Sequence, residues 1–155
     1  MLCEPLAQAS FAPFGDVIEA NGTPSKMINQ GLCGRYHDLA DMAAMGGRFG
    51  VSLFEAEPRS LPYVLDMVER HPKGSQCFIP MHQNPFLVVV TDTPGARPRA
   101  FLTNGAQGVN FHRGTWHGVL TPLAAPGLFA VIDRTQTEDN LEEHWFDAPY
   151  RVIGG

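Results

Sequence analysis

An acid, an imidazole, a hydroxyl and a carboxamide occur within eight residues of sequence, at Glu69, His71, Ser75 and Gln76. A carboxyl group and an imidazole can transfer protons, and both can bind a divalent metal. If residues 65–71 form a strand, Glu69 and His71 share one face, because side chains alternate along a strand. The pattern therefore predicts a strand that carries both groups into a pocket. A surface hairpin with solvated polar side chains is the alternative that these residues alone leave open.

Polar residues gather at two other places in the chain. Residues 110–117 include an asparagine and two histidines, and residues 35–38 read Arg-Tyr-His-Asp. Each group has a plainer explanation: Asn110 could cap a turn, and His117, which follows Trp116, could be a buried structural histidine. Residues 35–38 could form a solvated loop.

The elements that must position these side chains are mostly short strands. Alternating or continuous apolar segments separated by turn residues predict about eight strands. The clearest lie at 48–55, 65–71, 86–91, 99–103 and 128–134, with a further strand beginning near residue 76. Pro72 and Gly74 predict a tight turn between the two polar-bearing strands, and residues 39–45 are predicted to form a short helix. This organisation predicts an all-β sandwich or barrel with minor short helices.

Length and composition bound the possible functions. The 155 residues predict a single domain, residues 1–155, with 44% hydrophobic and 17% charged residues. A net charge of −5 argues against nucleic acid or an anionic membrane as the main partner. No apolar segment approaches the length of a membrane span, and the N-terminus lacks the features of a secretory signal. Three widely spaced cysteines form neither a zinc pattern nor a disulfide framework, which predicts a cytoplasmic location.

The two polar segments resemble the paired motifs of the cupin barrels. Those motifs read His-x-His, three or four residues, Glu, and later Pro-x-Gly-x-x-His. The matching positions here are Glu69, His71, Gln76, His112, Gly114 and His117. Glu69, Gln76 and His112 depart from the pattern. The resemblance implies a cupin-type double-stranded β-helix, a jelly-roll barrel that brings both motifs to one mouth.

A second resemblance is more specific and covers most of the chain in order. The motifs that carry it are Ile28-Asn29-x-Gly31, 35–40 (Arg-Tyr-His-Asp-Leu-Ala), 69–76 (Glu-Arg-His-Pro-x-Gly-x-Gln), 78–81 (Phe-Ile-Pro-Met), 104–110 (Asn-Gly-x-Gln-Gly-Val-Asn), Trp116-His117 and 132–134 (Ile-Asp-Arg). They resemble the ureidoglycolate lyase family, formerly called ureidoglycolate hydrolase. The resemblance implies an enzyme that splits ureidoglycolate into glyoxylate and urea during the degradation of allantoin and other purine-derived ureides. It also implies a homodimer and dependence on a divalent metal such as Ni²⁺, with no organic cofactor.

The chemistry of that reaction suits the residues. His71 can transfer protons near neutral pH, and Glu69 in a partly apolar mouth would have a raised pKa and could act as an acid. Arg35 offers a guanidinium fork for the substrate carboxylate, while Gln76 and Asn110 can bind the urea group as donors and acceptors. In a second version of the site, a metal is held by four side chains and acidifies the substrate hydroxyl. Those four are Glu69, His71, Gln76 and His117, and His117 is also the alternative catalytic base.

The sequence leaves two other functions open. One is a ureidoglycolate amidohydrolase, which would release ammonia and carbon dioxide instead of urea. The other is a non-catalytic cupin that binds a small carboxylate. The identity of the products separates the two enzymes, and tight binding without turnover would indicate the third possibility.

Overall fold

The computed structural model describes residues 1–136 and 138–155. The chain is almost entirely β, as predicted, with one helical turn, α1 (Gln8–Phe11), and one 3₁₀ turn, η1 (Asn29–Gly31). The strands are β1 (Cys3–Pro5), β2 (Gly15–Ile18), β3 (Lys26–Ile28), β4 (Cys33–Arg35), β5 (Phe49–Glu55), β6 (Tyr63–Arg70), β7 (Gln76–Pro80), β8 (Phe86–Thr91), β9 (Arg99–Leu102), β10 (Gly108–Phe111), β11 (Trp116–His117), β12 (Thr121–Pro122), β13 (Leu128–Arg134) and β14 (Glu142–Val152). No helix in these ranges is long and apolar enough to cross a bilayer.

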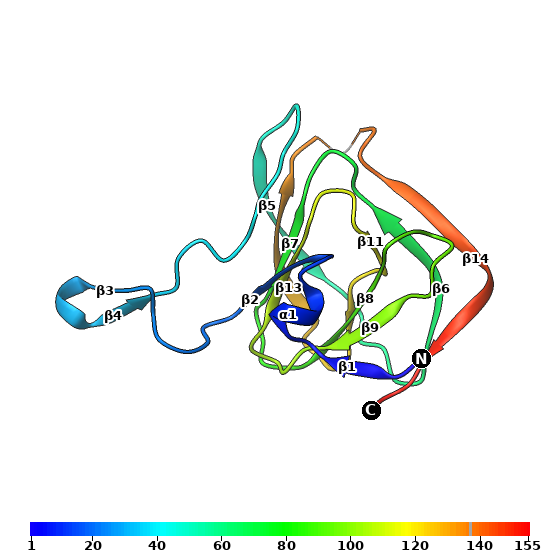
Figure 1. Ribbon diagram of the computed structural model, residues 1–155, viewed down its shortest axis with the longest axis horizontal. Helices are drawn as coiled ribbons and strands as arrows, with labels where there is room; N and C mark the ends of the chain where they lie inside the picture. Colours follow the sequence, from blue (N-terminus) through cyan, green and yellow to red (C-terminus); the bar gives the residue numbers. More distant parts are fainter. Residues whose placement is uncertain (137) are drawn as a thin grey trace.

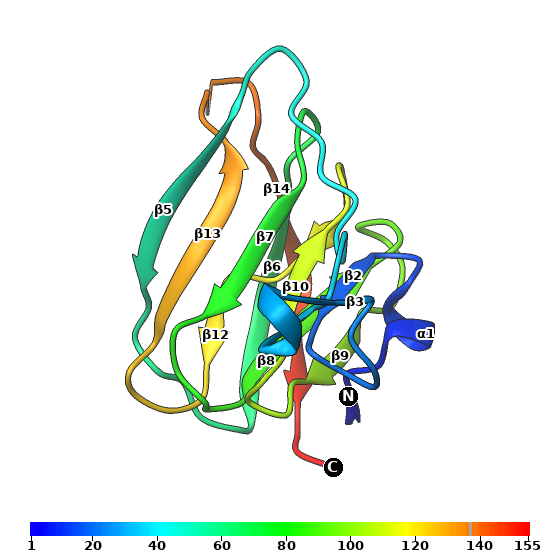
Figure 2. The same cartoon turned by 90° about the vertical axis from the view of Figure 1, so that its left-hand side faces the viewer.

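Two curled sheets face each other and form the barrel (Figure 1). One has the strand order β1-β9-β8-β11-β6-β14, with β12 paired to β8, and the other has the order β2-β10-β7-β13-β5. Strands β3 and β4 form a separate hairpin that extends away from the barrel (Figures 1 and 2). The predicted all-β cupin-type barrel is therefore confirmed.

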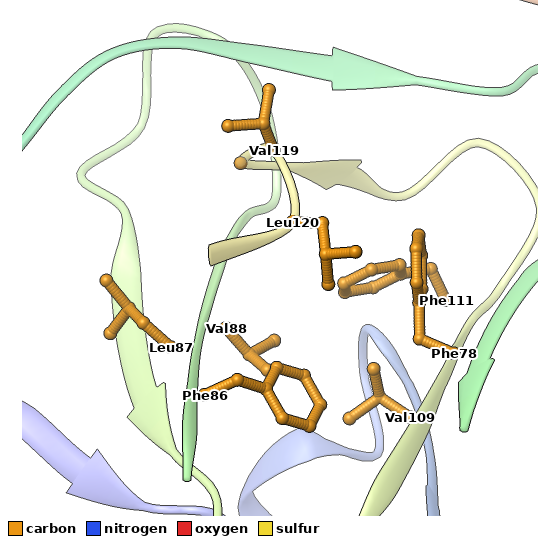
Figure 3. Close-up of a pocket in the computed structure, with 9 residues that line it drawn as sticks. Phe78, Phe86, Leu87, Val88, Val109, Phe111, Val119 and Leu120 are labelled. Atoms are coloured by element: carbon orange, nitrogen blue, oxygen red, sulfur yellow. The ribbon is translucent and has the colours of Figure 1, made fainter. Parts of the chain in front are cut away.

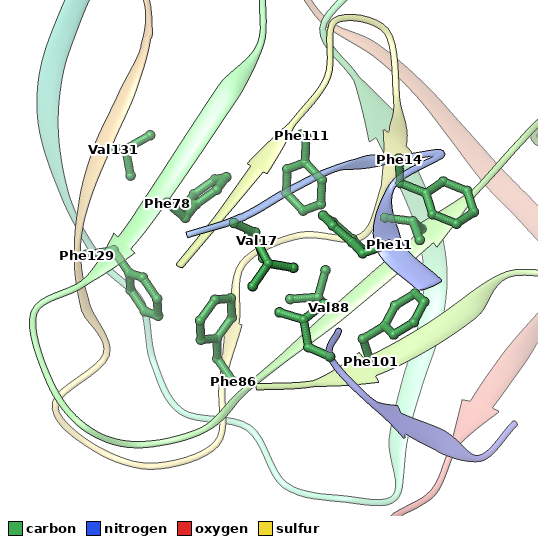
Figure 4. Packing of buried hydrophobic residues seen from close by; sticks show 13 residues of the cluster. Phe11, Phe14, Val17, Phe78, Phe86, Val88, Phe101, Phe111, Phe129 and Val131 are labelled. Carbon is green, nitrogen blue, oxygen red and sulfur yellow. The ribbon is translucent and has the colours of Figure 1, made fainter. Parts of the chain in front are cut away.

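Aromatic side chains fill the space between the two sheets. Seven phenylalanines belong to one buried cluster (Figure 4): Phe11, Phe14, Phe78, Phe86, Phe101, Phe111 and Phe129. Strand β8 is buried along its whole length, which explains its continuous apolar sequence. A void of only about 10 Å³ remains beside Phe78, Phe86 and Val88 (Figure 3). Because it is apolar and about the size of one water probe, it is a packing gap and not a ligand site.

The predicted helix over residues 39–45 is wrong, because this segment lies extended across the outside of the barrel wall. Its backbone groups bond to other strands and turns: the Asp41 amide donates to Asp16, and the Ala43 amide donates to the Ser75 hydroxyl. The Ala43 carbonyl accepts from the Ser75 amide in return. Tertiary hydrogen bonds therefore outweigh the modest helix propensity of alanine and methionine at these positions.

Candidate active site

Three of the predicted site residues converge at one mouth of the barrel. Glu69 is the next-to-last residue of β6, His71 follows that strand directly, and His117 lies on β11 opposite Glu69 in the antiparallel pairing of the two strands. One potential ligand atom from each residue lies within 4.8 Å of the others. The His71 Nε2 and Glu69 Oε1 atoms are 4.0 Å apart, and the two imidazole centroids are 5.4 Å apart.

Backbone carbonyls fix the orientation of both imidazoles. His71 Nδ1 lies 2.8 Å from the Asn140 carbonyl, and His117 Nδ1 lies 3.0 Å from the Gly118 carbonyl. Since a carbonyl only accepts, each Nδ1 carries a proton, and in the neutral form of either ring Nε2 presents a lone pair. Both Nε2 atoms are buried and have no hydrogen-bond partner among the described residues. The Phe111 ring, stacked 4.2 Å from His117, holds that imidazole in place.

Gln76 faces the same interior. It lies opposite Phe111 in the β7–β10 pairing and opposite Asp133 in the β7–β13 pairing, and directly paired residues point to the same side of a sheet. Its Nε2 donates to Asp133 Oδ2 at 3.1 Å. Its Oε1 is buried without a hydrogen-bond partner in the part of the chain that the structure describes.

The burial of the site shifts two pKa values in ways that matter for chemistry. Burial raises the pKa of the Glu69 carboxyl; attraction to His71 offsets part of this rise, and repulsion from Glu143 adds to it. Burial, followed by repulsion from His71, lowers the pKa of His117 to about 3, although its bond to Gly118 acts in the opposite direction. His117 is therefore a neutral imidazole at neutral pH, and Glu69 binds a proton more readily than an exposed glutamate.

The donor set fits a borderline divalent metal. Two imidazole nitrogens without partners and one carboxyl group form a ligand set that nickel, zinc or iron accepts in proteins. Carbonyl bonds to the far nitrogens of both histidines are the usual support for such ligands. The buried Gln76 Oε1 is a further oxygen donor on the same interior face, although an amide is a weaker ligand than a carboxylate.

Arg35 does not reach this mouth within one chain. It ends β4 on the projecting hairpin, is exposed, and lies with its Nη2 atom 2.9 Å from His37 Nδ1 (Figure 1). The expectation that Arg35 lies in one pocket with His71 is therefore not met within a single chain. Local sequence could not reveal this, because the hairpin makes its main contacts with itself.

Asn110 also lies elsewhere, on the opposite face of the barrel wall. Along β10 it alternates with Phe111, which points inward, and it pairs with Cys77 instead of Gln76. Its Nδ2 donates to Asp16 Oδ2 at 2.9 Å and to the Asp41 carbonyl at 3.0 Å. Asn110 is completely buried and attaches segment 39–45 to the sheet. The expectation that Asn110 and Gln76 share one urea-binding pocket is therefore not met.

The carboxylate of Asp16 is the centre of this outer cluster and gives a stability prediction. Burial would raise the pKa of Asp16, but hydrogen bonds from Asn110, from the Asp41 amide and from His112 hold it below its ordinary value. A lowered folded-state pKa stabilises the protein above the ordinary aspartate pKa, and this contribution is lost as the pH falls through the folded value. We expect Asp16→Asn to cost about 1–3 kcal/mol at pH 7 and much less at about pH 3.

Urea denaturation of the wild type and of Asp16→Asn at both pH values measures this difference. Asp147→Asn is the matched control, since Asp147 is exposed on β14 and is expected to change little at either pH. An equal loss of stability at pH 7 and pH 3 would show that the ionised carboxylate does not contribute.

Two residues of the site were not recognised in the sequence as functional. Asn140 lies 69 residues from His71, yet its carbonyl accepts from the imidazole and its side chain accepts from the Lys73 amide. Asp133 does not pair with its neighbour Arg134, because adjacent strand residues face opposite sides of the sheet. The Arg134 guanidinium instead donates to backbone carbonyls, among them Met45 and Gly46. Only the alternation along β13 could have assigned Asp133 to the interior.

The fold and the site together define a cupin-type protein with two histidines and one glutamate at the barrel mouth. The family model described as ureidoglycolate lyase matches residues 1–153, so the chain belongs to the ureidoglycolate lyase family.

Several curated relatives agree with this assignment. The chain is 52% identical over 159 aligned positions to a ureidoglycolate lyase of Rhodobacter capsulatus, covering 99% of this chain and 98% of that protein. It is 52% identical to ureidoglycolate lyase 2 of Rhizobium meliloti, over 96% of this chain and 94% of that protein. It is 48% identical to a ureidoglycolate lyase of Chelativorans sp., over 98% of this chain and 95% of that protein.

Proposed function

We propose that this protein is a carbon–nitrogen lyase that converts ureidoglycolate into glyoxylate and urea. The convergence of Glu69, His71 and His117 in a chain that the ureidoglycolate lyase family model matches over residues 1–153 carries the proposal. The reaction belongs to the degradation of allantoin and other purine-derived ureides, which releases nitrogen for reuse. The three cysteines are free, which is consistent with a reducing, cytoplasmic location.

The reaction requires two proton transfers at one carbon atom. The hydroxyl proton leaves, a carbonyl forms, the carbon–nitrogen bond breaks and the departing nitrogen gains a proton, which gives glyoxylate and urea. The free Nε2 of His71 is suited to accept the hydroxyl proton. Glu69, whose raised pKa favours the protonated form, is suited to donate to the nitrogen. The two groups are 4.0 Å apart, beyond direct hydrogen-bond distance, so the proton returns from His71 to Glu69 through a bridging water after each turnover.

A divalent metal such as Ni²⁺ defines the second version of the site. Glu69, His71 and His117 would hold it, with the Gln76 amide oxygen as a fourth ligand. When bound, such a metal supplies Lewis acidity for the substrate carboxylate and hydroxyl. The proton-transfer and ligand roles of Glu69 exclude one another, so metal analysis of the active protein separates the two versions.

Product analysis tests the proposed reaction. Purified protein is incubated with racemic ureidoglycolate, with and without a chelator, and glyoxylate, urea and ammonia are measured. We expect glyoxylate and urea in equal amounts. Release of ammonia would instead indicate the amidohydrolase, and tight carboxylate binding without turnover would indicate a non-catalytic cupin.

We also propose that the protein is a homodimer. In the part of the chain that the structure describes, β5 pairs only with β13 and so has an open edge. Its outward side chains Val51 and Leu53 are 73% and 63% exposed, and Leu32 on the projecting hairpin is 87% exposed. Open apolar edges are normally covered, and two-fold dimers are the commonest way to cover them. A monomer in light scattering at micromolar concentration would contradict this.

In a dimer, the projecting hairpin of one copy could place its Arg35 at the catalytic mouth of the other copy. We expect Arg35→Lys to raise KM about 10-fold with a smaller effect on kcat, because the charge stays and the guanidinium fork is lost. Steady-state kinetics on ureidoglycolate measure both constants. Arg97→Lys is the control for a general loss of arginine, since Arg97 is exposed on the loop between β8 and β9 and lies outside the hairpin.

Mixing two inactive variants tests whether Arg35 of one copy serves the catalytic mouth of the other. Arg35→Ala and His71→Ala proteins are unfolded together, refolded and assayed against each variant alone. If the hairpin serves the second copy, mixed dimers contain one complete site and regain activity. If both residues act within one chain, the mixture stays as inactive as its parts.

A further inference from the structure

Gln76 and Asp133 are neighbours on the inner wall, and each presents one acceptor oxygen that has no hydrogen-bond donor among the described residues. The two residues are directly opposite in the β7–β13 pairing, and Gln76 Nε2 donates to Asp133 Oδ2 at 3.1 Å. That bond fixes the orientation of the amide, so Gln76 Oε1 is presented as an acceptor. Gln76 is only 6% exposed, and its Oε1 is buried without a partner among the residues described. A buried acceptor without a donor costs free energy, so such an atom is normally paired in the working protein.

The Asp133 carboxylate opens on one side into a cavity of about 410 Å³ that is also lined by Arg48, Gly50 and Ser52. Gly50 lies opposite Asp133 in the β5–β13 pairing, so no side chain covers the carboxylate from that strand. On its other side, the row continues through Gln76 to Phe111, whose ring stacks on His117. The two acceptors therefore lie on the wall between an open cavity and the catalytic mouth.

The nearby basic side chains do not neutralise this pair. Arg134 is 7% exposed, and its guanidinium donates to backbone carbonyls, including Met45 and Gly46. Arg48 makes one long hydrogen bond, 3.4 Å to the Phe49 carbonyl, and no ion pair with a described carboxylate. Asp133 Oδ2 accepts from Gln76, and Oδ1 is thus available to accept from a ligand.

We propose that Gln76 Oε1 and the Asp133 carboxylate form the subsite that binds the ureido group of the substrate. This inference rests on the proposed lyase function and deepens it, and it requires that Gln76 Oε1 is not a metal ligand. A ureido group presents N–H donors from adjacent nitrogens, and two neighbouring acceptors match them. A carboxylate in place of the ureido group has no donor and would leave the buried Gln76 Oε1 unpaired, and a hydroxyl has only one donor for the two acceptors, so the pair also selects the substrate. Asp133 is a binding and specificity residue in this assignment.

The test is Asp133→Asn, with binding of urea and of glyoxylate followed separately. The new amide can keep its oxygen toward Gln76 Nε2 but then turns an NH₂ donor toward the ligand. We expect urea to bind roughly 10- to 100-fold more weakly, both as a product inhibitor and in ligand-observed NMR. Glyoxylate inhibition should stay within about 2-fold of the wild type, and kcat/KM for ureidoglycolate should fall by the same factor as urea binding.

Two further variants keep the result interpretable. Asp66→Asn is the matched control, because Asp66 is exposed on β6, and it should leave both ligands unaffected. Gln76→Met removes the amide acceptor with little change in volume, and it should weaken urea binding in the same way if Asp133→Asn fails to fold.

The outcomes separate this inference from the proposed function. Unchanged urea binding in both folded variants, in a protein that releases urea from ureidoglycolate, overturns the subsite alone. An equal loss of urea and glyoxylate binding also overturns it, since that pattern indicates a purely structural role. A wild type that releases no urea from ureidoglycolate overturns the lyase function, whereas urea binding by NMR still reports on the subsite.

Discussion

Replacing His71 by alanine is expected to lower kcat for ureidoglycolate cleavage by at least about 100-fold, the scale of a lost general acid or base. His71 presents the free Nε2 that faces Glu69, and both the proton-transfer and the metal versions of the site require that atom. Stability should change little, because an alanine at a polar mouth leaves no large apolar cavity. The measurements are steady-state kinetics and urea denaturation of the same preparation.

His144→Ala is the control for the loss of an imidazole near the mouth. His144 lies on β14 opposite Val68, so it points away from the face that carries Glu69. We expect its kcat to stay near that of the wild type. If His71→Ala kept near-normal activity while folded, the base would have to be His117 or His37; if it unfolded, His71 would be structural.

Glu69→Gln is the second change with a large expected effect, again at least about 100-fold in kcat. Glutamine keeps the shape of the side chain but can neither donate a carboxylic proton nor give a metal a negative charge. Metal content measured alongside the kinetics distinguishes the two versions of the site. Loss of metal together with activity supports the ligand role, and loss of activity alone supports the acid role.

Glu143 provides a close control for this variant. It lies directly opposite Glu69 in the β6–β14 pairing but is exposed, and it acts on Glu69 only through charge repulsion. Glu143→Gln should therefore leave kcat within a few fold of the wild type. A Glu69→Gln protein as active as Glu143→Gln would remove Glu69 from the mechanism.

Local sequence patterns predicted the part of the site that lies on β6, on β7 and in the turn between them. Alternation placed Glu69 and His71 together, and Pro72 with Gly74 predicted the turn that returns the chain to Gln76; the structure has all of these features. His117 was paired with them only through the cupin resemblance, since its place opposite Glu69 depends on how distant strands join.

The misplaced residues show where local patterns fail. Asn110 has the right residue type for a urea ligand, but the single-residue alternation with Phe111 turns it to the outer face. The position of Arg35 depends on where the β3–β4 hairpin lies, and no local sequence pattern determines that position. Strand β14, which carries no regular apolar alternation, was not predicted, although it pairs with β6 and begins shortly after Asn140, the residue that orients His71.

A crystal structure of the protein soaked with glyoxylate and urea would decide which face of the barrel wall holds the active site, because both faces carry polar side chains. We expect glyoxylate against Glu69, His71 and His117, inside the mouth, with urea on Gln76 and Asp133. Both products bound on the outer face, beside Asp16 and Asp41, would contradict it.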